Sequence, residues 1–372
     1  MNFSDIKGQN HNNILNKNGA MNNEITKDNT SSTFIGKEDY SNRNNMLLFI
    51  NNNNSSFLEK FELNEFISSG SSGYVFKGIY KHCKKPVAVK FLINGNKKEN
   101  NDSKNRKSQK QEIEISKKFH NKNITEVYDY FKKDKISYLV LELGKYGDIG
   151  HFLKNLLKRK SLSETALVYF GKQILEGLKY MHGCKVAHMD IKPDNIILGL
   201  NLQAKITDFS ISCSYSDFNP EDLVKFPFVG TGKYIAPEII NREHMKIKDT
   251  EKIDIYSFGV TLYYLFYGEY PYGLNGINSR NYKNISKNIK ENKLEFPEKK
   301  SISNIGKDFL EKILDKDYNK RLNIKQALGH PWIQGAQIII DEKEKIGNQE
   351  CFLIQLITDN IKYFNEYIKK KK

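Results

Sequence analysis

A short polar stretch around a proline constrains this chain more than any other feature. It runs His188-Met189-Asp190-Ile191-Lys192-Pro193-Asp194-Asn195, and Asp208-Phe209-Ser210 follows after a small hairpin pattern, 196–198 and 205–207. One carboxylate can orient an attacking hydroxyl and accept its proton. A second carboxylate and an amide oxygen can hold Mg²⁺, and a lysine can steady a transferring phosphate. The spacing therefore predicts phosphoryl transfer. The alternative is a pair of polar loops that flank a hairpin.

A glycine-bearing turn lies nearer the N-terminus, between two β-type runs. Glycines allow backbone N–H groups to approach the phosphates of a nucleotide closely. Serine- and glycine-rich hairpin turns are also common without any ligand, so the turn alone does not decide between these two readings. Its residues are Ile67, Ser68, Ser69, Gly70, Ser71, Ser72, Gly73, Tyr74 and Val75.

A lysine follows this turn inside an apolar run, Val87-Ala88-Val89-Lys90. A charge within such a strand requires a partner, and a phosphate can supply one. The alternative is a lysine on an edge strand that reaches solvent. The order strand, turn, strand and lysine favours the first interpretation, because it is the arrangement that positions phosphates in protein kinases.

The composition argues against secreted and membrane-spanning proteins. No apolar run approaches the length of a membrane span, and the N-terminus has no apolar signal-peptide region. We therefore expect an intracellular, cytoplasmic protein, with a nuclear location left open. The cysteines are far apart and form no C-x-x-C pair, so neither a disulfide framework nor a zinc ribbon is indicated. They are Cys83, Cys184, Cys213 and Cys351.

The chain is basic, with 59 Lys and Arg against 44 Asp and Glu and a formal net charge of +15. Clustered basic side chains can neutralise nucleic-acid phosphates. Here the lysines are spread through segments rich in asparagine, and no nucleic-acid recognition fold accompanies them. We therefore expect a biased composition and no nucleic-acid partner.

The character of the sequence changes along the chain. Residues 1–57 are rich in Asn and Ser and are expected to be disordered, because they offer too little apolar surface to offset their ordering entropy. A Lys- and Asn-rich insert at 94–109 is expected to form a solvated loop. Short β-type runs are expected before and around it, and helices are expected at 111–119 and 164–181, the second with Ser161 and Glu164 as a capping box. The β-type runs are 61–68, 74–80, 86–93 and 136–143.

A helical stripe of apolar residues at 351–368 precedes a run of lysines at the end of the chain. Three interpretations remain open for this helix: packing on the folded domain, binding of a partner, and contact with a membrane surface.

The chain resembles a eukaryotic protein kinase of the serine/threonine branch over about residues 61–333. Besides the segments above, Thr231-Gly232-Lys233-Tyr234-Ile235-Ala236-Pro237-Glu238 resembles the end of an activation segment, and 254–260 resembles the helix that braces the catalytic loop. Arg321 resembles the arginine that pairs with the glutamate at the place of Glu238. The resemblance implies an α+β, two-lobed kinase domain over 58–333. A small β-rich N-lobe would span 58–143, a larger helical C-lobe 144–333 and a C-terminal extension 334–372.

The resemblance also implies a site for ATP with Mg²⁺ and a protein substrate that carries Ser or Thr. Asp190 resembles the catalytic base and Lys192 the lysine that steadies the phosphate, while Asn195 and Asp208 resemble the magnesium ligands. Lys90 resembles the lysine on the α- and β-phosphates, with Ala88 on the same strand. The other residues are Glu112 as the partner of Lys90 (with Glu114 as the fallback candidate), Leu141 as the gatekeeper, and Glu142 and Gly144 at the adenine-binding hinge.

Several positions depart from the family pattern. Ser68 replaces the first glycine of the turn, Ser116 replaces an apolar packing residue, and Ser210 replaces the glycine after Asp208-Phe209. Met189 stands where many kinases have arginine, so a phosphorylated loop residue would lack a usual cationic partner. We therefore predict activity that does not strictly depend on phosphorylation of the loop, in a kinase that fits no single kinase group.

Two questions about function remain open at this point. Asp148 and Asp194 resemble acidic positions that meet upstream arginines of a substrate, whereas Tyr264 stands at a third such position. A preference for basic substrates and its absence are therefore both compatible with the sequence. Because Ser68 and Ser210 depart from the pattern, the alternative to an active kinase is a pseudokinase scaffold that binds partners without turnover.

Overall fold

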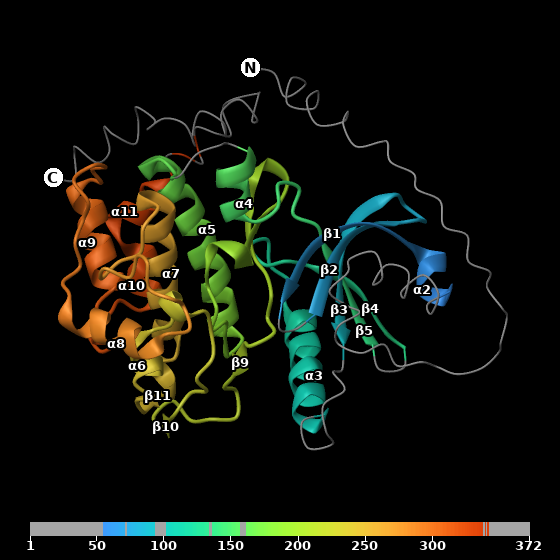
Figure 1. Ribbon diagram of the computed structural model, residues 1–372, viewed down its shortest axis with the longest axis horizontal. Helices are drawn as coiled ribbons and strands as arrows, with labels where there is room; N and C mark the ends of the chain where they lie inside the picture. The colour runs from blue at the N-terminus through green and yellow to red at the C-terminus, as the bar shows by residue number, and fades with distance from the viewer. Residues whose placement is uncertain are drawn as a thin grey trace, which may run out of the picture. The chain divides into compact units, whose positions relative to one another are not determined.

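An antiparallel sheet of five strands, in the order β1-β2-β3-β5-β4, precedes a mainly helical region (Figure 1). The computed structural model describes residues 55–70, 73–93, 102–133, 136–156, 161–337, 339 and 341, all within the unit Ile50–Lys372. This is the two-lobed protein kinase fold that the sequence indicates. The elements of the first lobe are α2 Ser55–Lys60, β1 Phe61–Gly70, β2 Gly73–Tyr80, β3 Lys85–Ile93, α3 Asp102–Lys118, β4 Val127–Lys133 and β5 Ile136–Glu142.

Strand β4 has no counterpart among the expected elements. It is only 7 residues long and its last two residues are lysines, so the sequence offers too few alternating positions to predict a strand here. Tertiary pairing with the more apolar β5, from Val127 opposite Leu141 to Lys133 opposite Ile136, stabilises it at the edge of the sheet.

The folded part begins before residue 58. Phe57 is 3% exposed, and its ring stacks at 4.9 Å on both Phe61 and Tyr138. The expectation that an extension without structure runs to residue 57 is therefore wrong for Phe57, whose aromatic surface is buried in the small lobe. Residues 1–54 lie outside the described residues.

The expected loop at 94–109 is also wrong in part, because helix α3 already begins at Asp102. Lysine, glutamine and arginine, which this segment contains, are good helix formers. The polar composition of this segment therefore did not exclude a helix. Residues 94–101 lie outside the described residues.

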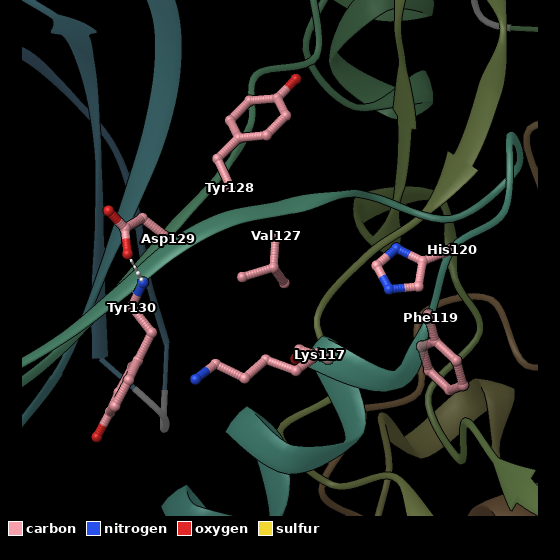
Figure 2. Close-up of a pocket in the computed structure, with 8 residues that line it drawn as sticks. Lys117, Phe119, His120, Val127, Tyr128, Asp129 and Tyr130 are labelled. Atoms are coloured by element: carbon pink, nitrogen blue, oxygen red, sulfur yellow. Dashed lines mark hydrogen bonds between the residues drawn. The ribbon is translucent and has the colours of Figure 1, made fainter.

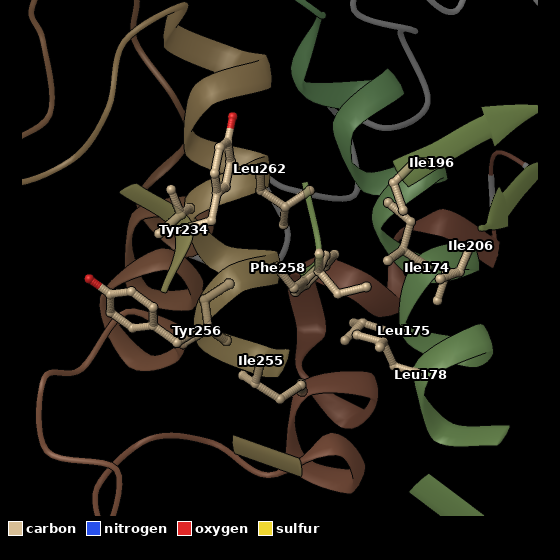
Figure 3. Packing of buried hydrophobic residues seen from close by; sticks show 14 of the residues in the cluster. Ile174, Leu175, Leu178, Ile196, Ile206, Tyr234, Ile255, Tyr256, Phe258 and Leu262 are labelled. Carbon is tan, nitrogen blue, oxygen red and sulfur yellow. The ribbon is translucent and has the colours of Figure 1, made fainter. Parts of the chain in front are cut away.

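The second lobe packs its helices around one large apolar cluster, part of which is drawn in Figure 3. Leu175 and Leu178 of α5 and Phe258 of α7 all belong to this cluster. The larger elements are α5 Glu164–Gly183, α7 Glu251–Tyr267, α8 Tyr282–Glu291, α9 Asn304–Ile313 and α10 Ile324–Gly329, and the short helix α11 Pro331–Gln334 follows them. The short ones are α4 Ile149–His151, η3 Phe152–Leu156, β6 Val186–Ala187, η4 Pro193–Asn195, β7 Ile196–Leu198, η5 Leu200–Leu202, β8 Ala204–Ile206, β9 Cys213–Ser214, β10 Leu223–Val224, η6 Gly232–Tyr234, α6 Pro237–Ile240, β11 Met245–Lys246 and η7 Ile247–Asp249.

Helix α5 begins as expected at Glu164, but with a different cap. Ser163 is the N-cap residue, and its side chain accepts a hydrogen bond from Ala166 N at 3.0 Å. Ser161 instead accepts from Lys300 Nζ, and Glu164 accepts from the indole of Trp332 at 2.8 Å. The expected capping box is therefore wrong, because tertiary partners take both of its side chains.

Within the described ranges, no helix combines the length and the apolar character that crossing a membrane requires. The helix expected at 351–368 lies outside the part of the chain that the structure describes.

Candidate active site

Lys90 joins three parts of the chain through its ammonium group. It lies on β3, and its Nζ donates to Glu112 Oε1 on α3 at 2.5 Å and to Asp208 Oδ1 at 2.8 Å. Burial disfavours the charge on Lys90, but the two carboxylates outweigh burial and raise its pKa above the ordinary value. Burial also opposes the charge of Asp208, but Lys90 outweighs it and lowers the pKa of Asp208 to about 2. Lys90 and Asp208 are therefore charged at neutral pH, whereas burial raises the pKa of Glu112 above its ordinary value, against the opposing effect of Lys90.

Glu112, and not Glu114, faces Lys90. The Glu112 side chain is 4% exposed, whereas that of Glu114 is 60% exposed and lies 3.7 Å from Lys110. One turn further along the helix, Ser116 donates a hydrogen bond of 2.6 Å to the backbone oxygen of Glu112. The hydroxyl of the buried serine is thus satisfied inside its own helix, at a position where the family pattern has an apolar packing residue.

Asp190 lies at the centre of the polar stretch. Its Oδ2 accepts hydrogen bonds from Lys192 Nζ at 2.6 Å and from Asn195 Nδ2 at 3.1 Å. Its Oδ1 is buried and has no hydrogen-bond partner among the described residues. A buried carboxylate oxygen without a donor is costly unless a ligand supplies one, so this atom can accept a hydrogen bond from a substrate hydroxyl.

Lys192 bridges Asp190 to a second segment of the chain. Its Nζ also donates to Thr231 Oγ1 at 2.6 Å. Thr231 is flanked by glycines at close backbone contacts: Gly230 has φ of +113°, and a Cβ there would lie 2.8 Å from the Met189 carbonyl oxygen. A Cβ on Gly232 would overlap the carbonyl oxygen of Ser279. The glycines therefore allow Thr231 to approach Lys192.

A buried aspartate of α7 holds the backbone that carries Asp190. Asp254 accepts hydrogen bonds of 2.8 Å from the backbone N–H groups of His188 and Met189, and its Oδ2 lies 2.8 Å from His182 Nε2. Met189 has φ of +71°, a conformation that this pair of bonds stabilises. Asp254 and His182 were not among the candidate site residues. The available signal for Asp254 was the resemblance of 254–260 to the helix that braces the catalytic loop.

Asn195 and Asp208 are brought together by the hairpin β7–β8. The backbone N–H of Thr207 donates to Asn195 O at 3.0 Å, which ties the residue before Asp208 to Asn195. Asn195 Nδ2 donates to Asp190 O at 2.8 Å, so the amide nitrogen is used inside the protein and the amide oxygen is the atom left to act as a ligand. One carboxylate and one amide oxygen fit Mg²⁺, which binds few protein ligands together with nucleotide phosphates. The described residues hold no group of three His, Cys, Asp or Glu side chains that would bind a metal by themselves.

The glycine-bearing turn joins β1 and β2. Ser68 pairs with Val75, Ser69 with Tyr74 and Gly70 with Gly73 in the antiparallel register, and Ile67 is 46% exposed. Gly73 has φ of +144°, and a Cβ there would overlap the Phe91 carbonyl oxygen, so only glycine fits. Ser71 and Ser72 lie outside the described residues.

The expected hinge follows β5. Leu141 pairs with Ala88 of β3, and Ala88 is buried. Glu142 Oε2 accepts from Lys205 Nζ at 2.8 Å, and a Cβ on Gly144 would lie 3.0 Å from Ile197 Cβ. The chain therefore passes from β5 to the second lobe against the hairpin β7–β8, which directly follows Asn195.

Arg321 and Glu238 form a buried ion pair in the second lobe. Arg321 Nη1 donates to Glu238 Oε1 at 2.6 Å, Nη2 donates to Oε2 at 3.0 Å, and the two side chains are 0% and 1% exposed. This bidentate geometry fixes the end of the segment that contains Thr231.

A separate cavity of about 210 Å³ lies between the end of α3 and strand β4 (Figure 2). None of the candidate site residues lines it. Lys117 extends along it, with its Nζ 4.5 Å from the centre of the Tyr130 ring. The lining residues are Ser116, Lys117, Phe119, His120, Val127, Tyr128, Asp129 and Tyr130.

Comparison with known proteins gives one family. A sequence model of the protein kinase domain matches residues 61–333. Aurora kinase from Dictyostelium discoideum is 29% identical over 74% of this chain and 66% of its own length, slightly less than two thirds. Death-associated protein kinase 2 from Homo sapiens is 31% identical over 80% of this chain and 78% of its own. Serine/threonine-protein kinase Aurora-2 from Arabidopsis thaliana is 30% identical over 73% of this chain and 89% of its own.

Proposed function

Because this chain belongs to the protein kinase family, we propose that it transfers the γ-phosphoryl group of ATP, with Mg²⁺, to serine or threonine of a protein. The observation that carries the proposal is the hydrogen bonding of the Asp190 carboxylate. Its Oδ2 is held by Lys192 and Asn195, while its Oδ1 is buried without a partner among the described residues. This arrangement supports an acceptor site for a substrate hydroxyl.

In the proposed mechanism Asp190 receives the acceptor hydroxyl at Oδ1, orients its oxygen and takes up its proton. Lys192 is within reach of Asp190 and places a positive charge beside the phosphate as it transfers. Bound Mg²⁺ would neutralise the charge of the phosphates, with Asn195 and Asp208 as its protein ligands. Lys90 would contact the α- and β-phosphates from β3. Positioning and electrostatics supply most of the catalysis in such a site.

The contact between Lys192 and Thr231 supports serine and threonine as acceptors. Lysine at position 192 and threonine before Gly232 resemble the serine/threonine branch of the family. The relative from Arabidopsis thaliana carries serine/threonine-protein kinase in its name. The proposed kinase domain covers residues 58–333, extended by Phe57 at its start.

We also propose that basic residues of a substrate contact Asp194. This side chain is exposed on η4, close to Asp190. Asp148 is partly engaged, because its Oδ1 accepts from His151 N at 2.8 Å and caps α4. A library of peptides with randomised positions tests the preference. Enrichment of arginine or lysine upstream of the acceptor, reduced in Asp194→Asn, is expected, and no enrichment in the wild type would contradict it.

A pseudokinase scaffold is the second candidate, and Ser68 and Ser210 favour it. Transfer of labelled phosphate from ATP to a general protein substrate separates the two candidates, with the modified residues identified by mass spectrometry. An active kinase gives phosphoserine or phosphothreonine. A pseudokinase gives no transfer, even where ATP with Mg²⁺ raises the melting temperature of the protein.

A further inference from the structure

The activation segment, defined here as residues 208–238, contains a long stretch that cannot be phosphorylated. From Asp217 to Gly230 the sequence has no serine, threonine or tyrosine. The residue before Asp190 is the uncharged Met189, which is 4% exposed and belongs to the apolar cluster of the second lobe. A phosphate in the middle of this segment therefore has no residue to carry it and no arginine at position 189 to bind it.

A glutamate lies between two lysines in this same stretch. Glu221 Oε2 lies 2.8 Å from Lys246 Nζ, and Glu221 Oε1 lies 2.6 Å from Lys248 Nζ. Hydrogen bonds from the two lysines lower the pKa of Glu221 to about 2, so the carboxylate is charged throughout the physiological range. Glu221 belongs to the activation segment, whereas the lysines belong to the segment after α6.

Backbone pairing joins the same two segments. Leu223 and Val224 of β10 pair with Lys246 and Met245 of β11. Beyond the Leu223–Lys246 pair, Ile247 N donates to Asp222 O at 3.1 Å and Lys248 N donates to Pro220 O at 2.9 Å. A ladder of two residues per strand is marginal by itself. The ion pairs of Glu221 with Lys246 and Lys248, which connect the same two segments, therefore help to keep the activation segment in place.

The part of the activation segment that pairs with β11 lies between two other contacts that fix this segment. On its N-terminal side β9 pairs with β6, and Tyr215 N donates to Lys185 O at 2.9 Å. On its C-terminal side Thr231 contacts Lys192, which contacts Asp190. Release of the middle of the segment would therefore loosen the chain that presents Thr231 to the catalytic loop.

We propose that Glu221, Lys246 and Lys248 form a charge clamp that keeps the activation segment ordered without phosphorylation. Phosphorylation orders such segments by adding a negative group that pairs with basic side chains, and a carboxylate held between two ammonium groups supplies the same interaction permanently. The three residues are positioning residues, because they act on the site through the chain. The consequence for catalysis rests on the function proposed above, whereas the ordering of the segment does not.

Hydrogen exchange of the full-length, phosphatase-treated protein tests the clamp, with the absence of phosphate verified by mass spectrometry. Glu221→Lys places three positive charges together and is expected to speed amide exchange over 216–227 about 5-fold, since exposed pairs contribute modestly. The reversed combination Glu221→Lys with Lys246→Glu and Lys248→Glu restores slow exchange. Glu311→Lys, the same charge change at an exposed position of α9, leaves the segment unchanged.

The kinetic readout is a rise in KM for the protein substrate in Glu221→Lys, with KM for ATP unchanged and with recovery in the reversed combination. Exchange over 216–227 that is equal in wild type and Glu221→Lys, or that is not restored by the reversal, would overturn the clamp. A wild type that gains activity only after phosphorylation of residues 208–238 would also overturn it. A wild type with the expected exchange pattern but no transfer in any state would refute the proposed function and support the clamp.

Discussion

Lys90 and Glu112 meet at 2.5 Å in a pair whose side chains are 6% and 4% exposed. Lys90 belongs to β3 and Glu112 to α3, so the pair fixes the helix against the sheet. The same ammonium group lies 2.8 Å from Asp208 in the second lobe. A single lysine thus links the sheet, the helix and the candidate metal ligand.

Glu112→Gln is expected to reduce both stability and phosphate transfer. Removing one partner of a buried ion pair generally costs about 3 kcal/mol or more of unfolding free energy. For Glu112→Gln we expect a loss near the lower end of this range, because Lys90 keeps its contact with Asp208. Misplacement of Lys90 is expected to lower kcat/KM by about 100-fold. Urea denaturation and steady-state kinetics measure the two effects.

Glu114→Gln is the matched control, two positions along the same helix and 60% exposed. Its unfolding free energy is expected to stay within about 0.5 kcal/mol of the wild type. Equal losses in the two variants would contradict the role given to Glu112.

The comparison of Glu112 and Glu114 shows what the sequence can predict. The chemistry-bearing motifs and most strands follow from residue types and spacing, and the two-lobed fold follows from the family resemblance that these motifs carry. The resemblance indicated Glu112 as the partner of Lys90 with Glu114 as the fallback candidate, and the orientation of α3 against β3 is a tertiary property that decides between them.

Other features depend on contacts between distant parts of the chain. Ser161 and Glu164 have the spacing of a capping box, yet each side chain bonds a residue more than a hundred positions away, Lys300 and Trp332. The resemblance indicated a helix at 254–260 that braces the catalytic loop, but not that the Asp254 side chain makes the contact with the backbone of His188 and Met189. Local patterns cannot indicate such partners.

Arg321→Met is expected to destabilise the second lobe by about 3–5 kcal/mol, because it leaves the Glu238 carboxylate buried without its partner. The arginine also donates to the backbone oxygens of Asp315 and Lys252, at 2.9 and 2.7 Å. Urea denaturation measures the loss. A double variant with Glu238→Gln should be more stable than the sum of the single losses predicts, and additive losses would argue against a coupled pair.

His330 is expected to make stability depend on pH near neutrality. Burial lowers its pKa below the ordinary 6.5, against an opposing effect of Asp308. Nδ1 accepts from Trp332 N at 3.2 Å, and Nε2 lies 2.9 Å from Asp308 Oδ2, which suits the neutral ring. The unfolded chain therefore binds more protons below pH 6.5, and stability falls as the pH falls through that value.

Urea midpoints measured from pH 8 to pH 5.5 test this dependence, with His330→Asn as the comparison because asparagine retains an acceptor for Trp332 N. The stability difference between wild type and variant should shrink as the pH falls. A difference that stays constant, or grows, would show that His330 is not the group that titrates.

Ser210→Gly is expected to loosen the segment around Phe209. Asp208 has φ of +66°, and Phe209 is buried with its ring 5.1 Å from that of Phe119. A Cβ at position 210 restricts the backbone, so glycine should cost about 0.5–1 kcal/mol of stability and speed amide exchange at 208–210. Ser216→Gly, at an exposed position of the same segment, is the control, and equal exchange at 208–210 in both variants would refute the effect.

The most direct test of the proposed catalysis is the rate of phosphate transfer by Asp190→Asn. Loss of the group that accepts the hydroxyl proton should lower kcat by about 10²–10⁴-fold, while the thermal stabilisation by ATP with Mg²⁺ persists. Asp217→Asn, which changes an exposed carboxylate of the activation segment, should retain the wild-type rate. A folded Asp190→Asn variant that transfers phosphate as fast as the wild type would contradict the account.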